Sequence, residues 1–227
     1  MPLDWSPLWL SLRVAVLSTA LSLVVGLALA YLFANYHFRG KELWDSIITL
    51  PLALPPTVLG YYLLILLGRS SAIGRTWEAI TGSPLVFTPT AAVIAAFFHS
   101  APLLVKSARA ALESVDHSYE RAARTLGSSD WRVFARVSLP LAAPSIAAAT
   151  LLAFARSLGD FGVTIMLAGN IPGRTQTAAV AIYEAVESGD ASVARAFVLA
   201  ISAIILIVLA LANKAGGSLL PTRPFVR

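Results

Sequence analysis

The sequence contains no cysteine and little charge. The missing cysteine excludes disulfides, thiolate metal sites and cysteine nucleophiles. Asp, Glu, Lys and Arg make up only 13% of the 227 residues, against about a quarter in an ordinary soluble domain. The three histidines, at positions 37, 99 and 117, are too scattered to predict a metal site. No G-x-x-x-x-G-K-[S/T] motif is present, so no P-loop for ATP is expected.

Long apolar runs take the place of charge. Five runs carry no Asp, Glu, Lys or Arg: residues 14–36, 46–68, 79–105, 137–155 and 196–213. One crossing of the hydrocarbon core needs about 20 apolar residues, and runs without strand-like alternation favour helices. We therefore predict an all-α integral membrane protein, a single domain over residues 1–227 with a five-helix transmembrane core. The predicted helices cover residues 8–36, 43–67, 89–112, 140–168 and 193–213.

The basic residues predict the orientation of the chain in the membrane. If residues 113–140 lie in the cytoplasm, most of the basic residues lie on that side, as the positive-inside rule requires. Those residues are Arg39, Lys41, Lys106, Arg109, Arg121, Arg124, Arg132, Arg136, Lys214, Arg223 and Arg227. The other side holds Arg69, Arg75, Arg174 and Arg195. We expect the N-terminus outside and the C-terminus in the cytoplasm. We also expect an outer loop at 69–88 and an outer segment at 169–190, which contains a short amphipathic helix at 175–186. The net charge of +5 then needs no nucleic acid as partner.

The charged segment 113–140 has the pattern of two short helices joined by a sharp turn. Asp116 is a good N-cap for a helix that ends near Leu126. Gly127 suits the left-handed position after a helix, and Ser128 or Ser129 can cap the second helix. We expect both helices to lie along the inner membrane surface, where the segment forms a knob for a partner protein. The alternative is an ordinary amphipathic interfacial helix.

Two apolar segments contain residues that are unusual inside a membrane. Pro51, Pro55 and Pro56 kink the second predicted helix, which must then face protein or a water-filled cavity. Arg156 lies in the outer half of the fourth helix, one turn before Asp160, which is expected to neutralise it. This pair either lines a passage for an anion or snorkels to the surface. The candidate passage residues are Pro55, Pro56, Thr57, Arg156, Ser157 and Asp160.

The spacing in segment 113–140 resembles the coupling loop of importer-type ABC permeases, which reads E-A-A, three residues, Gly, nine residues, I-x-L-P. Ala122 and Ala123 are followed after three residues by Gly127, and nine further residues lead to V-S-L-P at 137–140. Arg121 stands where the pattern has Glu, with Glu120 one residue earlier. The resemblance implies that these residues contact an ATPase: Tyr119, Glu120, Ala122, Ala123, Gly127, Trp131, Phe134, Leu139 and Pro140.

The segments LPLALPP at 50–56 and FARSLGDFG at 154–162 narrow the resemblance to the permease subunits of molybdate ABC transporters. That family implies a homodimer in the bacterial cytoplasmic (inner) membrane. It also implies two cytoplasmic ABC ATPases, which bind ATP and magnesium, and an extracytoplasmic oxyanion-binding protein. No cofactor and no catalysis are expected in this chain itself.

Other functions stay open at this point. Tungstate or sulfate and thiosulfate are alternative substrates of the same kind of machine. A secondary transporter or channel that works without ATP is a further class, which dependence of uptake on ion gradients would reveal. An intramembrane enzyme is disfavoured, because the chain has no cysteine, no H-E-x-x-H motif and no clustered carboxylates.

Overall fold

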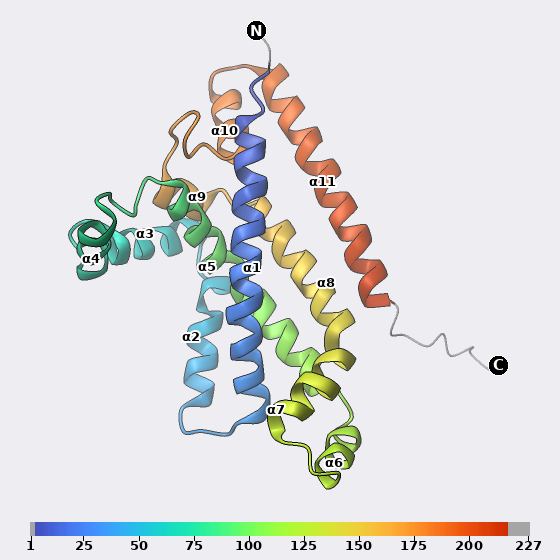
Figure 1. Ribbon diagram of the computed structural model, residues 1–227. Helices are drawn as coiled ribbons and strands as arrows, with labels where there is room; N and C mark the ends of the chain where they lie inside the picture. Colours follow the sequence, from blue (N-terminus) through green and yellow to red (C-terminus); the bar gives the residue numbers. More distant parts are fainter. Residues whose placement is uncertain (1–2, 218–227) are drawn as a thin grey trace, which may run out of the picture.

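Four long helices of the computed structural model, which describes residues 3–217, run side by side along the molecule (Figure 1). They are α1 (Ser6–Asn35), α5 (Pro89–Glu113), α8 (Leu139–Leu158) and α11 (Ala191–Gly217). The shorter elements are α2 (Lys41–Ala53), α3 (Pro56–Leu67), α4 (Ala72–Thr81), α6 (His117–Thr125), α7 (Asp130–Val133), a π-helical turn (Phe134–Ser138), α9 (Gly162–Ala168) and α10 (Ala178–Glu187). All regular secondary structure in the described part is helical, which confirms the all-α prediction.

The described part of the chain has four helices long and apolar enough to cross a membrane, or five if α2 and α3 together count as one span. That bent pair corrects the predicted helix at 43–67. It is not one kinked helix, because the chain bends by 116° between α2 and α3. Leu54, between them, has an extended backbone. Pro56 is the first residue of α3, where its missing backbone N–H costs the helix no hydrogen bond.

Two other predictions of secondary structure were wrong. The segment 69–88, expected to be a loop, contains α4, whose N-cap Ser71 accepts a 2.8 Å hydrogen bond from the backbone N–H of Gly74. The helix expected at 140–168 ends at Leu158, and a new short helix, α9, begins at Gly162. Apolar residues resume directly after Asp160, at 161–168, and the predicted helix was therefore extended across the break.

Small residues hold α1 against α5 in the middle of the bundle. The hydroxyl oxygens of Ser22 and Ser100 lie 3.4 Å apart, and both side chains are buried. A Cβ on Gly26 would lie 2.7 Å from Cδ2 of Leu104, so a larger residue here would require the Leu104 side chain to move. Small residues at such positions are typical of closely packed membrane helices.

Ion pairs join helix α2 to the bundle. The helix has no buried residue. Near its first turns, Asp45 pairs with Lys106 and, at 3.1 Å, with Arg109, both on α5. These ion pairs lie toward the end of the bundle where α6 and α7 are found (Figure 1).

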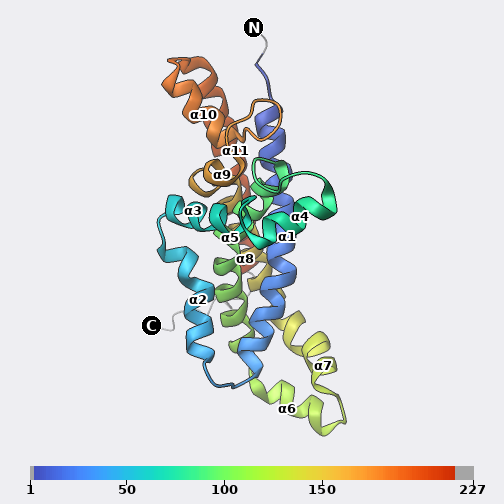
Figure 2. The ribbon, with the colours of Figure 1, turned by 90° about the vertical axis from the view of Figure 1, so that its left-hand side faces the viewer.

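The two ends of the bundle differ in the elements they carry. Figures 1 and 2 both place α6 and α7 at one end and α10 at the other, with the start of α1 on the side of α10. Most of the described basic residues that we expect on the cytoplasmic side lie in segments at the end of the bundle that carries α6. The predicted orientation, with the N-terminus outside, stays a prediction.

Candidate functional site

The first half of the predicted coupling segment folds as its sequence indicates. Asp116 caps α6 by accepting a 2.8 Å hydrogen bond from the backbone N–H of Ser118, and this bond lowers the pKa of the Asp116 carboxyl. Gly127 has a φ of +81° and donates its N–H to the carbonyl of Arg124. The helix, its cap and the left-handed turn at glycine are all confirmed.

The second half differs from the prediction. Helix α7 continues through the π-helical turn into α8, so residues 130–158 form one continuous helix rather than a separate surface helix. We call this helix, which bends between α7 and α8 (Figure 1), the rod. Pro140, in the first turn of α8, lacks an N–H. In the turn just before it, the N–H of Leu139 bonds the carbonyl of Phe134, five residues back. The π-helical turn therefore lies where proline interrupts the regular backbone hydrogen bonds of the helix.

Glu120 lies inside the knob rather than on its surface. Its side chain is 10% exposed, and the hydroxyl of Ser138 donates a 2.6 Å hydrogen bond to its Oε1. His117 Nδ1 lies 3.3 Å from its Oε2, and Arg124 lies 3.8 Å from the same atom. Glu120 therefore braces α6 against the π-helical turn. Its neighbour Arg121 is exposed.

A second contact joins α6 to the start of the rod. Arg124 Nε donates a 3.0 Å hydrogen bond to Asp130 Oδ1. The buried ring of Phe134 packs on Tyr31 of α1, with ring centroids 4.4 Å apart. The knob is thus fixed both internally and to the end of the bundle.

The knob exposes three large hydrophobic side chains beside charged ones such as Arg121, and we call these three residues the knob surface. They are Tyr119, Leu126 and Trp131, which are 59%, 86% and 67% exposed. Ala122 is exposed beside them, and Ala123 is half-buried. Leu126 was not predicted as a site residue, although its place just before the turn glycine was a usable signal. Of the other predicted contacts, Leu139 packs against the core and Pro140 is exposed.

The structure brings the two predicted passage segments together. Helices α3 and α9 pack on each other across two glycines. A Cβ on Gly60 would lie 2.6 Å from Cβ of Met166, and a Cβ on Gly162 would lie 2.7 Å from Cβ of Pro56. The break before α3 therefore lies beside the break before α9. Pro55, Pro56 and Thr57 are exposed at this place.

Arg156 and Asp160 do not form the predicted neutralising pair. No ion pair joins them within residues 3–217; instead, Arg156 Nε donates a 2.9 Å hydrogen bond to the carbonyl of His99. Asp160 is 4% exposed and caps α9, accepting bonds from the backbone N–H and the hydroxyl of Thr164. The unsatisfied N–H groups at the start of α9 explain why the carboxylate bonds this helix and not the arginine.

Two residues next to this arginine carry buried polar atoms without a partner. The hydroxyl of Ser157, the next residue in the chain, and Nδ1 of His99, whose carbonyl Arg156 binds, have no hydrogen-bond partner within the described residues. Buried polar groups are normally satisfied, so such atoms need water or another ligand.

The comparison with family models decides the class of the protein. Residues 22–215 match the model described as binding-protein-dependent transport system inner membrane component. The chain belongs to this family. Its membership confirms the prediction of an inner-membrane permease and agrees with the several spans and the knob at one end of the bundle.

Curated relatives of this permease cover most of its length. The molybdenum transport system permease protein ModB of Escherichia coli (strain K12) is 44% identical over 88% of this chain and 88% of its own. The protein of the same name from Haemophilus influenzae is 42% identical over 83% and 82%. A probable sulfate transport system permease protein of Chlorokybus atmophyticus is 34% identical over 83% of this permease and 66% of the relative.

Solved structures support the fold of the permease. A bacterial alginate ABC transporter in complex with its alginate-bound periplasmic protein has a chain with a TM-score of 0.75 and 17% identity, covering 94% of this permease and 78% of that chain. The inward-facing MetNI methionine ABC transporter has one with a TM-score of 0.72 and 16% identity, covering 93% and 94%. At such identities the likeness shows the fold alone.

Proposed function

We propose that this permease moves molybdate into the cytoplasm as the membrane-spanning subunit of an ATP-driven ABC importer, with tungstate as a closely similar substrate. The observation that carries the proposal is the 44% identity, over 88% of both chains, to a molybdenum transport system permease protein. The predicted orientation, with the N-terminus outside, places the knob in the cytoplasm.

The proposed assembly is a homodimer with two cytoplasmic ATPases and an extracytoplasmic oxyanion-binding protein. ATP and magnesium belong to the ATPases. Support for the ATPase contact comes from the knob surface, because Tyr119, Leu126 and Trp131 are large hydrophobic residues that are each more than half exposed. Support for the second copy comes from the exposed break at Pro55 and Pro56, because irregular backbone within a membrane has to be covered by protein or face a water-filled cavity.

The rod of residues 130–158 gives a mechanical route between these sites. It has 29 residues, or about 43 Å at about 1.5 Å per residue. Its first turn carries Trp131 of the knob surface, and its last turn carries Arg156. When the ATPases close on ATP, a knob braced by Glu120 and Ser138 moves with them and displaces the far end of the rod. This motion switches the passage between outward-open and inward-open states.

Arg156 is proposed to contact the oxyanion during its passage. A charged residue inside a membrane span is costly and usually faces a pathway or a partner charge. The guanidinium has a single hydrogen bond, to a backbone carbonyl, and no acidic partner within the described residues. A tetrahedral oxyanion supplies the missing acceptors, and the hydroxyl of Ser157 lies one residue away.

Sulfate is the second candidate substrate. It is favoured by the 34% identity to a probable sulfate permease protein. Sulfate and molybdate are both tetrahedral dianions, so a guanidinium serves either.

Reconstitution tests the proposal. The permease, its ATPase and its binding protein are placed in proteoliposomes, and ATP hydrolysis is measured with molybdate, tungstate, sulfate or phosphate. Stimulation by molybdate or tungstate alone supports the proposal. Stimulation mainly by sulfate or phosphate keeps the machine and overturns the substrate, and failure to form a complex with any ATPase overturns both.

A further inference from the structure

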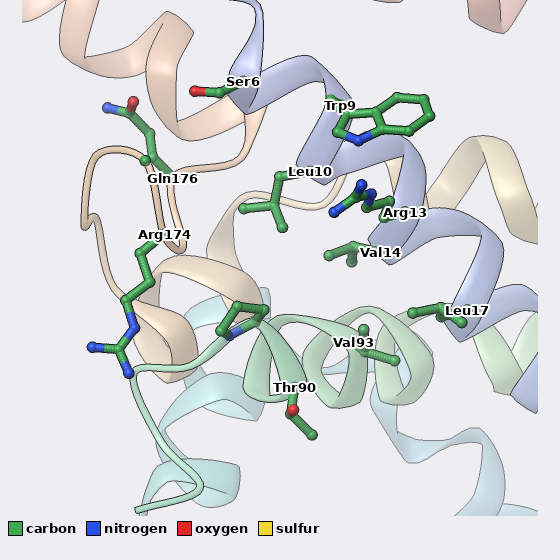
Figure 3. Close-up of a pocket in the computed structure, with 12 residues that line it drawn as sticks. Ser6, Trp9, Leu10, Arg13, Val14, Leu17, Thr90, Val93, Arg174 and Gln176 are labelled. Carbon is green, nitrogen blue, oxygen red and sulfur yellow. The ribbon is translucent and has the colours of Figure 1, made fainter.

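A groove of about 680 Å³ runs along the first part of α1, away from the knob and the passage. It lies between α1, the start of α5 and the loop that follows α9 (Figure 3). One end is polar, with Ser6, Arg174 and Gln176, and the other end is apolar, with Leu17 of α1 and Val93 of α5. Its chemical character thus changes along the helix axis.

The position of the groove along α1 matches the boundary of the bilayer. Arg13 is the last charged residue before the charge-free run of residues 14–36. That run measures about 34 Å at about 1.5 Å per residue, close to the hydrocarbon thickness of about 30 Å. Trp5 and Trp9, which are 48% and 57% exposed, precede it, as the aromatic belt of a membrane interface requires. The polar end therefore lies at headgroup level and the apolar end in the hydrocarbon.

Two uncompensated arginines line the groove. The guanidinium of Arg13 lies 4.9 Å from the ring centroid of Trp9, and Figure 3 shows it projecting from α1 into the groove. Neither Arg13 nor Arg174 has an acidic partner within the described part of the chain. Arginine binds phosphate strongly through charge-assisted hydrogen bonds.

We propose that this groove binds one anionic phospholipid from the leaflet on the side of the N-terminus. The lipid phosphate pairs with Arg13, and an acyl chain lies along Leu17 and Val93. Arg174, on the opposite side of the groove (Figure 3), adds positive charge to the headgroup region. A soluble anion uses only the polar end, whereas a phospholipid matches both ends and their order along the membrane normal. The bound lipid joins α1 to the loop before α10, two segments far apart in the sequence.

Native mass spectrometry of the purified full chain tests the charged end. The probes are phosphatidylglycerol and phosphatidylcholine with identical acyl chains. Each arginine near an anionic lipid surface contributes about a fivefold preference, so Arg13→Gln and Arg174→Gln should each lower phosphatidylglycerol adducts about fivefold and leave phosphatidylcholine adducts unchanged. Arg75→Gln on α4 is the matched control, since Arg75 is exposed but does not line the groove.

A neutral change tests the apolar end. Leu17 is 57% exposed, so Leu17→Trp is accommodated while it narrows the groove. We expect it to lower phosphatidylglycerol adducts with no change in charge. Unchanged adducts in Arg13→Gln combined with Arg174→Gln, or an equal loss in Arg75→Gln, overturn the proposal. So does a site that ignores Leu17→Trp and is emptied by inorganic phosphate, because it then binds soluble anions.

Discussion

The hydroxyl of Ser138 donates a 2.6 Å hydrogen bond to the buried carboxylate of Glu120. The two residues lie on opposite sides of the turn at Gly127, one on α6 and the other in the π-helical turn that leads into α8. The bond fixes the angle between α6 and the rod. A contact between permease and ATPase transmits motion only if this angle is held.

Ser138→Ala removes the donor and leaves the carboxylate buried. A hydrogen bond to a charged group contributes about 1.5–3 kcal/mol, so α6 should loosen by about that amount. We expect faster hydrogen exchange at residues 117–126 and fewer oxyanions transported per ATP hydrolysed. Ser129→Ala is the control, because the Ser129 side chain makes no cap hydrogen bond. Normal coupling in Ser138→Ala would show that the brace has no mechanical role.

The turn at Gly127 predicts a graded series of variants. Its φ is +81°, and a Cβ there meets nothing within 4 Å, so only the backbone opposes a side chain. Asn tolerates this conformation, Ala costs about 1–2 kcal/mol, and Pro cannot adopt it. Pro also removes the N–H that bonds Arg124. Transport-coupled ATP hydrolysis should fall in the order Asn, Ala, Pro.

Membrane insertion provides the control for this series. The turn lies outside the candidate spans, so all three variants should reach the membrane in normal amounts. Normal coupled ATP hydrolysis by Gly127→Pro would contradict the proposed role of the turn.

Local signals in the sequence were sufficient where the structure obeys local rules. Asp116 and Gly127 were predicted from capping and turn preferences, and both were confirmed. The predicted start of a helix at residue 89 was also confirmed. The break between α2 and α3 was not predictable as a 116° bend. Proline predicts a kink, but its size depends on what the next helix packs against, and here Gly60 and Gly162 admit α9 beside α3.

The candidate site shows the same division. The knob residues were found from their spacing, but that spacing does not reveal which of them are buried. Glu120 faces inward because Ser138, eighteen residues later, lies beside it. Asp160 was expected to neutralise Arg156, since both lie on one predicted helix. The helix ends at Leu158, and Asp160 caps α9 instead.

Gly162→Ala tests the close contact of α3 with α9. A Cβ at this position lies 2.7 Å from Cβ of Pro56, an atom of a rigid ring. Overpacking of this kind costs about 1–3 kcal/mol, so the melting temperature of the purified permease should fall. Gly159→Ala is the matched control, since its Cβ meets nothing nearer than 3.6 Å. Equal melting temperatures for both variants would contradict the close packing.

Arg156 is the residue on which the proposed passage depends most. Arg156→Gln removes the charge, and Arg156→Lys keeps the charge but loses the guanidinium fork. If the anion contacts this group, uptake at low oxyanion concentration should fall at least about tenfold, or about 1.4 kcal/mol, in the first variant and less in the second. Initial uptake rates in proteoliposomes, divided by the amount of assembled complex, give this measurement.

The design of the Arg156 experiment separates passage from packing. Arg195→Gln is the control, because Arg195 is exposed and also donates its Nε to a backbone carbonyl, that of Ala191, at 3.0 Å. It should leave uptake unchanged. Since Arg156 makes one hydrogen bond within the described residues, to the His99 carbonyl, assembly should survive its replacement. Failure to assemble, with normal uptake by the complexes that do form, would assign Arg156 to packing and leave the oxyanion contact elsewhere in the passage.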